Sequence, residues 1–309
     1  MDTTVSILQK VRYSDQESEP FEFNVKRDDL IDPVISGNKW RKLKYNIAQA
    51  EHKNAKGIIT FGGAFSNHLV ATAKACAEHD LLSIGIVRGE ELNETSNETL
   101  KQCAFYGMEL RFVSRSDYKK RNDYTFIKNL QYEEPDYFMV PEGGANFYGV
   151  IGCQEILKET QNHYDHIYVS AGTGTTAAGI ALSMHPESKL HIVSALKGDF
   201  LKDETAKLIN LVFNDEEATA MLMQRVSFTS DTYFGGYGKW DRSLINLIQS
   251  FYRETDLKLE PIYTGKVLNK MLADRKDNLI SEEDKVLLVH TGGLQGVSGI
   301  ERKLGYQLF

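Results

Sequence analysis

Short apolar runs that alternate with longer amphipathic segments constrain this 309-residue chain more than any other feature of its sequence. The runs are rich in β-branched residues and apolar at successive positions, as in strands that are buried on both faces. Segments with helical periodicity separate them, clearest over residues 66–79, and a further helix is expected to start near Thr95 or Ser96. The predicted strands are 57–61, 82–87, 109–113, 137–140, 166–170, 189–194 and 286–290.

This alternation predicts βαβ units, and therefore an α/β fold with a largely parallel sheet. A hydrophobic fraction of 41% and a charged fraction of 26% are those of an ordinary globular protein. At about 150 residues per domain, the length suggests two domains. A net charge of −7 makes nucleic acid an unexpected partner, because a phosphate backbone needs a basic face. No apolar stretch is long enough to predict a membrane span.

The cysteines and histidines give no pattern of a structural metal site. Cys76, Cys103 and Cys153 are far apart and form no CxxC pair, which argues against a disulfide framework and a zinc site. The eight histidines are scattered and form no HxxxH or HExxH helix, so no metal is expected. We expect no secretory signal at the N-terminus, and a reducing cytoplasm is the simplest location.

Ligands of parallel α/β sheets bind beyond the carboxyl ends of the strands, so the residues that follow each strand are the candidates. The first such segment is SAGTGTTAAGI, residues 170–180. Its glycines and threonines leave backbone N–H groups uncovered just before a helix, which favours an anion such as phosphate. It matches neither a Walker P-loop nor a dinucleotide GxGxxG. A glycine-rich turn without a ligand is the alternative.

The second segment is SGNKWRKLKY, residues 36–45, in which four cations fall close together. Gly37 and Asn38 suggest that a helix starts just before Lys39. The positive end of a helix and the neighbouring cations favour the neutral form of that amine, which makes it more nucleophilic. The alternative is a solvated amphipathic helix.

The third segment is FGGAFSNHLVA, residues 61–71, a strand followed by a glycine turn and a helix. The Gly62–Gly63 pair permits close approach to the backbone, as a ligand carboxylate would require. Alternatively, Ser66 or Asn67 only caps the helix and His68 is structural. A fourth group in the C-terminal half, residues 232–240, 261–268 and 290–296, sets hydroxyl side chains beside glycines, which is also ordinary turn chemistry.

Together these segments resemble the pyridoxal-phosphate enzymes of the tryptophan synthase β fold type, in the branch of D-cysteine desulfhydrase and 1-aminocyclopropane-1-carboxylate deaminase. The resemblance implies an α/β fold with two open, twisted, mostly parallel sheets flanked by helices. It also implies a homodimer, and a smaller domain of residues 48–155 inserted into a larger cofactor-binding domain of residues 1–47 and 156–309. The matching motifs, in chain order, are GNKWRKL, SNH, PEGGAN, AGTGTT, PIYTGK and HTGG.

The resemblance assigns roles to particular residues. Lys39 would hold the cofactor through its amine and return as a proton carrier, and Asn67 would bond the pyridine 3′-oxygen. Tyr263 would approach the reacting carbon, with Tyr237 as a second active-site phenol. The substrate would be bound by Ser66, Asn67, His68 and Tyr263, with Ser66 also a candidate proton carrier. The cofactor phosphate would be bound by Gly172, Thr173, Gly174, Thr175 and Thr176.

The cofactor is an electron sink, so loss of an α-proton and then of a β-substituent becomes feasible, giving a 2-oxo acid and ammonia. The family's cyclopropane deaminases have Glu and Leu where this chain has Thr264 and Thr291, near the cofactor ring. Its desulfhydrases have Thr at both, which favours β-elimination from D-cysteine or a similar small D-amino acid. The alternatives are cyclopropane deamination and a non-catalytic amino-acid-binding relative. A nicotinamide oxidoreductase is disfavoured, because no GxGxxG unit follows a strand.

The chain departs from the family pattern at several positions close to these motifs. Phe65 stands where the family has Gln, and Val70 where it has Arg. Lys239 lies in YGKWD in place of YGVPN, and Glu260 replaces an Asp. We expect the departures to bear on how the substrate side chain is held.

Overall fold

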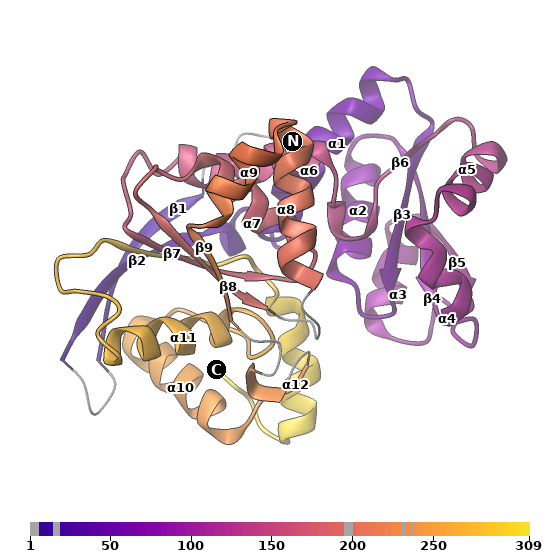
Figure 1. Ribbon diagram of the computed structural model, residues 1–309. Coiled ribbons are helices and arrows are strands. Elements are labelled where there is room, and N and C mark those ends of the chain that lie inside the picture. Colours follow the sequence, from indigo (N-terminus) through magenta and orange to yellow (C-terminus); the bar gives the residue numbers. More distant parts are fainter. Residues whose placement is uncertain (1–5, 15–18, 195–199, 230–232, 236–237) are drawn as a thin grey trace. The chain divides into compact units, whose positions relative to one another are not determined.

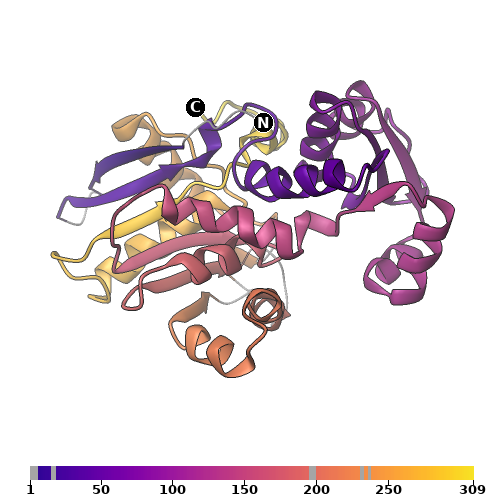
Figure 2. The same ribbon diagram turned by 90° about the horizontal axis from the view of Figure 1, so that it is seen from above.

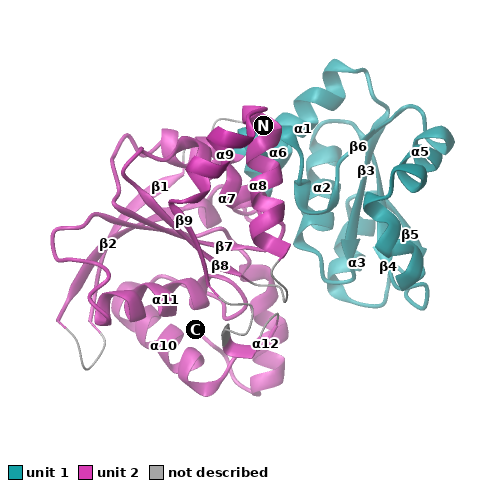
Figure 3. Cartoon of the chain, in the orientation of Figure 1, with its two compact units in different colours: residues 1, 39–152 teal, residues 2–38, 153–309 magenta. Residues whose placement is uncertain are grey.

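In the computed structural model, the chain forms two compact units, each built on its own sheet (Figure 3). The structure describes residues 6–14, 19–194, 200–229, 233–235 and 238–309. Unit 1 comprises residues 39–152, and unit 2 comprises residues 2–38 together with residues 153–309. Both units are α/β and their sheets are mostly parallel, which confirms the predicted fold class.

Unit 1 contains a four-stranded sheet in the order β5-β4-β3-β6, in which every strand is parallel to its neighbours. All four strands were predicted. For β3 and β4 the reason is burial along most of their length, which gives them continuous apolar runs. The strands are β3 (Gly57–Gly63), β4 (Leu82–Arg88), β5 (Met108–Val113) and β6 (Tyr137–Met139). The helices are α1 (Asn38–His52), α2 (Asn67–Glu78), α3 (Glu98–Phe105), α4 (Arg115–Lys119), α5 (Tyr124–Glu133) and α6 (Phe147–Lys158).

Unit 2 contains a six-stranded sheet in the order β1-β2-β10-β7-β8-β9, and only the β1–β2 pair is antiparallel. Helices α10 and α11 pack with the strands in one apolar core, and α7 and α8 lie on the other face (Figure 1). The strands are β1 (Ile7–Tyr13), β2 (Phe21–Arg27), β7 (His166–Ala171), β8 (Lys189–Ser194), β9 (Val226–Thr229) and β10 (Val286–Val289). The helices are α7 (Thr175–Ser183), α8 (Phe200–Phe213), α9 (Glu216–Met223), α10 (Arg242–Thr255), α11 (Thr264–Lys276) and α12 (Val297–Leu304).

Short 3-10 segments complete the described helices, and they serve as turns. Within the described ranges, no helix is long and apolar enough to cross a lipid bilayer. The 3-10 segments are η1 (Asp28–Leu30), η2 (Lys120–Asn122), η3 (Glu142–Gly144), η4 (Tyr233–Gly235) and η5 (Leu294–Gly296).

The sequence did not predict the β1–β2 hairpin, which lies at one edge of the unit 2 sheet (Figure 2), or β9 at the other. Strand β1 is half exposed and interrupted by Lys10 and Arg12, so it lacks the continuous apolar run of a buried strand. The helix expected to start near Thr95 or Ser96 begins at Glu98. Its actual cap is Asn97, whose side chain accepts a hydrogen bond from the Leu100 N–H.

Continuous helices cross both boundaries between the units. Helix α1 begins with Asn38 of unit 2 and continues into unit 1, and α6 runs from unit 1 into unit 2. The predicted domain boundaries, 47/48 and 155/156, fall inside these two helices and not in linkers. The inserted domain of residues 48–155 therefore stays a prediction.

Gly152 allows α6 to lie against the backbone of α1 within unit 1. A Cβ atom at this position would lie 1.9 Å from the Arg41 carbonyl oxygen, a backbone atom that cannot turn aside. We expect Gly152→Ala to lower the free energy of unfolding by more than about 2 kcal/mol, measured by urea denaturation. Gly299→Ala is the matched control, because it adds a Cβ to a helix where nothing lies within 4 Å. Similar stabilities of the two variants would contradict the prediction.

Candidate active site

The glycine-threonine loop of unit 2 follows β7 and leads into α7, as predicted. Gly174 has a φ of +80°, and a Cβ there would lie 2.7 Å from Thr205 Oγ1, so the turn requires glycine. No side chain caps the start of α7. The Thr173 and Thr175 hydroxyls lie 3.0 Å apart, and Thr175 and Thr176 are buried in the first turn of the helix. Uncapped N–H groups, nearby hydroxyls and the positive end of the helix fit a phosphate group.

The Gly37–Asn38 segment is bound to this loop and to the residues after β10, all within unit 2. Asn38 Nδ2 donates to Thr176 Oγ1 at 3.0 Å, and the Asn38 N–H donates to the Thr291 carbonyl at 3.2 Å. The Thr291 hydroxyl in turn lies 3.2 Å from that of Ser170, the penultimate residue of β7. Asn38 is the first residue of α1, and Lys39 follows it. The sequence had suggested only that a helix starts at Asn38. It did not predict that Asn38 contacts Thr176, one of the residues expected to bind the phosphate.

A buried carboxylate organises the start of α11. Glu260 is 1% exposed and accepts hydrogen bonds from three successive backbone N–H groups, those of Ile262, Tyr263 and Thr264, at 2.7–2.9 Å. The Thr264 hydroxyl lies 3.1 Å from the same carboxylate. Burial raises the pKa of Glu260, and the hydrogen bonds oppose that shift. Glu260 therefore places Tyr263 and Thr264, a role for which the sequence carries no signal beyond the Asp-to-Glu departure.

Unit 1 carries Ser66 and Asn67 at the start of α2. Ser66 is the N-cap, and its side chain accepts a long hydrogen bond of 3.4 Å from the Leu69 N–H. A Cβ on Gly62 would lie 2.7 Å from Ser66 Oγ, so the glycine makes room for this serine. Ser66 therefore caps α2, as one interpretation of the sequence expected. A partly exposed hydroxyl in such a weak bond can still reach a ligand.

His68 is buried in unit 1 and is held neutral. Its Nε2 lies 2.9 Å from Thr60 Oγ1, while its Nδ1 is buried without a hydrogen-bond partner. Burial, followed by the charges of Lys42 and Lys39, lowers the pKa of His68 to about 3. The PEGGAN segment adjoins this histidine. A Cβ on its Gly144 would lie 3.0 Å from Lys42 Cβ and 3.7 Å from His68 Cε1. A buried polar atom without a partner is unusual in a folded protein and marks a place where a ligand atom fits.

The predicted site residues are thus distributed over both units. Tyr237 lies outside the described residues. Unit 1 holds Lys39, Ser66, Asn67 and His68, whereas unit 2 holds the glycine-threonine loop, Tyr263, Thr264 and Thr291.

The neutral state of His68 has a consequence for acid stability. In the folded protein the imidazole stays uncharged down to about pH 3, whereas in the unfolded chain it takes up a proton below about pH 6.5. Acidification below pH 6.5 therefore favours unfolding, by up to about 1.4 kcal/mol per pH unit from this residue. We expect His68→Gln to flatten the pH dependence of urea unfolding between about pH 6.5 and 5. The exposed-residue control His52→Gln should leave the slope unchanged, and equal slopes in both variants would contradict the prediction.

The Glu260 network has a consequence for stability. Glu260→Gln replaces the carboxylate by a neutral amide, so all three backbone N–H groups lose a charged acceptor and at least one of them faces an NH2 donor. We expect the free energy of unfolding to fall by about 1–3 kcal/mol, measured by urea denaturation. The exposed Glu283→Gln is the control and should change it by less than about 0.5 kcal/mol. Variants of equal stability would show that the carboxylate does not hold this turn.

Comparison with known proteins identifies the family of this chain. Residues 8–292 match the model of a family described as pyridoxal-phosphate dependent enzymes. A Pyrococcus horikoshii protein named "Putative 1-aminocyclopropane-1-carboxylate deaminase" is 32% identical over 282 residues, which cover 88% of this chain and 84% of that protein. The Arabidopsis thaliana mitochondrial bifunctional D-cysteine desulfhydrase/1-aminocyclopropane-1-carboxylate deaminase is 27% identical over 88% of this chain and 72% of its own length.

A solved structure described as a homologue of 1-aminocyclopropane-1-carboxylate (ACC) deaminase superposes with a TM-score of 0.76 at 27% identity. The superposed region covers 94% of this chain and 89% of the chain in that structure. The loop of unit 2 fits the phosphate of the family's cofactor, and the resemblance seen in the motifs is confirmed. The chain belongs to the pyridoxal-phosphate-dependent enzymes, and within them it is of the ACC deaminase and D-cysteine desulfhydrase type.

Proposed function

We propose that this enzyme catalyses β-elimination from D-cysteine or a similar small D-amino acid, releasing sulfide, ammonia and a 2-oxo acid. One observation carries this choice: Thr264 and Thr291 are buried hydroxyl residues where the family's cyclopropane deaminases have Glu and Leu. Both hydroxyls have partners inside the protein, Glu260 and Ser170 respectively, which supports a role for them beyond that of surface substitutions. A hydroxyl beside the cofactor ring favours its protonated form less than a carboxylate does, so the ring is a weaker electron sink. A weaker sink suits the elimination of a good leaving group such as sulfide.

Pyridoxal phosphate would be held by the residues to which the motifs assign that role. Bound pyridoxal phosphate supplies an electron sink for the bonds that break next to the amine. The N–H groups and hydroxyls of Gly172–Thr176 would bind its phosphate, and Asn67 its 3′-oxygen. Lys39 would hold the cofactor through Nζ and afterwards carry the α-proton.

The substrate would be bound mainly by unit 1 residues. Ser66 and the neighbouring backbone amides would bind its carboxylate, and the unpartnered Nδ1 of neutral His68 offers a further polar contact. Tyr263 would deliver a proton to the departing sulfur, with Tyr237 as the second phenol. The Cα–H and Cβ–S bonds break, the electron pair leaves with sulfur, and one water is consumed. D-Cysteine and water thus give pyruvate, ammonia and hydrogen sulfide.

A second candidate function is deamination of 1-aminocyclopropane-1-carboxylate to 2-oxobutyrate and ammonia. The names of the Pyrococcus horikoshii and Arabidopsis thaliana relatives support it. That substrate has no α-hydrogen, so its ring opening needs a different first step. A relative that binds an amino acid without turnover is the third possibility.

We also propose a cytoplasmic homodimer. The three cysteines are buried thiols that form no disulfide within the described part of the chain, as expected in a reducing compartment. The dimer rests on the resemblance to the fold type. Light scattering of the purified protein at a mass near 70 kDa, about twice the 35.0 kDa chain, would support it.

The role of Lys39 can be tested directly. Borohydride reduction should fix the cofactor to the peptide that contains Lys39, as read by mass spectrometry. Lys39→Ala should lose its yellow colour on dialysis, because no amine remains to bind the cofactor covalently. The exposed Lys53→Ala is the control and should stay yellow. A label on another lysine, or a colourless protein that cannot be reconstituted, would refute the assignment.

The choice of substrate can be tested by product analysis. We expect sulfide and pyruvate from D-cysteine, at a kcat/KM at least about tenfold above that for 2-oxobutyrate formation from the cyclopropane amino acid. The reverse order would assign the second candidate function. A yellow protein that releases neither product would favour the binding relative.

A further inference from the structure

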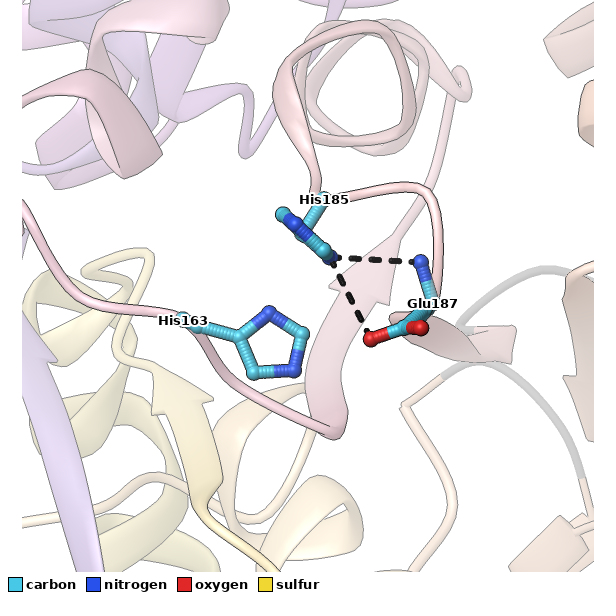
Figure 4. A group of neighbouring side chains, drawn as sticks. All are labelled: His163, His185 and Glu187. Carbon is cyan, nitrogen blue, oxygen red and sulfur yellow. Dashed lines mark hydrogen bonds and ion pairs between the residues drawn. The ribbon is translucent and has the colours of Figure 1, made fainter.

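Two loops of unit 2 bring His163, His185 and Glu187 together (Figure 4). His163 lies before β7, and the other two residues lie between α7 and β8. One ligating atom from each side chain lies within 4.8 Å of the others. The two imidazole rings are 4.3 Å apart between centroids and nearly perpendicular, and His185 Nδ1 lies 3.9 Å from the Glu187 carboxylate.

We propose that His163, His185 and Glu187 bind a divalent transition-metal cation such as Zn²⁺. Two imidazoles and one carboxylate form a nitrogen-rich set that suits borderline cations, whereas Mg²⁺ and Ca²⁺ prefer oxygen ligands. No metal was expected from the sequence, because no two histidines have the spacing of a metal-binding helix. That criterion cannot detect ligands that lie on separate loops.

Asp165 orients the first of these ligands. His163 Nε2 lies 3.1 Å from Asp165 Oδ1, and Asp165 Oδ2 accepts the backbone N–H of Lys285 at 2.8 Å. Because Nε2 faces a carboxylate, His163 Nδ1 is the nitrogen left for a metal, and this atom is buried with no hydrogen-bond partner. A carboxylate that holds one imidazole nitrogen while the other binds the metal is a common arrangement in metal sites.

The surroundings leave room for the cation and favour its charge. A cavity of about 260 Å³ is lined by both histidines and by polar groups that include Asn162 and Ser188. This volume is enough for a cation with bound water. The negative charges of Asp165 and Glu187 exceed the single positive charge of Arg225, whose guanidinium donates to the His185 carbonyl. The Glu187 side chain is 82% exposed and can turn toward the metal.

The position of the cluster indicates a stabilising metal and not a catalytic one. The cluster lies on the loops that enter β7 and β8, whereas the phosphate loop follows the carboxyl end of β7. Six strand residues span about 17 Å, so the cation would be far from that loop. It would join the two loops at the amino ends of neighbouring parallel strands.

Calorimetric titration of the cofactor-loaded enzyme with Zn²⁺ tests the proposal. We expect one Zn²⁺ per chain, and Co²⁺ in its place should give visible ligand-field absorption. His163→Gln and His185→Gln should each weaken binding at least about tenfold, while Asp165→Asn should weaken it less. The cysteines do not compete, because all three are buried and burial raises the pKa of Cys76 and Cys103 to about 12.

His52→Gln is the control, since this exposed histidine of unit 1 should leave the affinity unchanged. All the substituted ligands are at least partly exposed, so the variants should fold, and circular dichroism checks this. Absence of Zn²⁺ binding, or binding that both ligand variants leave unchanged, would overturn the proposal. Its outcome is independent of the substrate, because the readout is metal affinity.

Discussion

The left-handed turn at Gly37 is the constraint on which the rest of the candidate site depends. A Cβ at this position would lie 2.0 Å from the Thr291 carbonyl oxygen, and the φ of +66° is itself unfavourable for other residues. Glycine therefore lets the chain approach the loop after β10 closely enough for Asn38 to bond both Thr291 and Thr176. Helix α1 starts from this anchored residue, so the anchor determines where Lys39 enters the helix.

Burial is the second physical theme of the molecule. His68 and Glu260 are both buried ionisable groups, and in each case burial favours the neutral form. Hydrogen bonds offset that effect for Glu260, which faces several donors, whereas His68 has neighbouring cations that reinforce it. The two buried side chains thus differ in role: Glu260 bonds to the backbone, and His68 leaves one ring nitrogen without a partner.

The sequence predicted the interior strands well, because a parallel strand buried on both faces needs an unbroken apolar run. The β1–β2 hairpin escaped prediction, since half of β1 faces outward and its polar residues hide the pattern. The motif residues of the candidate site were found through their spacing within single loops. Asn38 and the His163 cluster could not be found in this way, because their contacts join segments that only folding brings together. The bonds of Glu260 run to residues two to four positions later, and the sequence carries no signal of them beyond the Asp-to-Glu departure.

The burial of the three thiols has a consequence for a protein that is proposed to release sulfide. A thiolate that attacks a polysulfide, an oxidised form of sulfide, displaces hydrosulfide and becomes a persulfide. Burial raises the pKa of Cys76 and Cys103 to about 12, so both side chains are almost entirely protonated at neutral pH. The Cys76 and Cys103 thiols would therefore react only slowly with polysulfides that form when the released sulfide is oxidised.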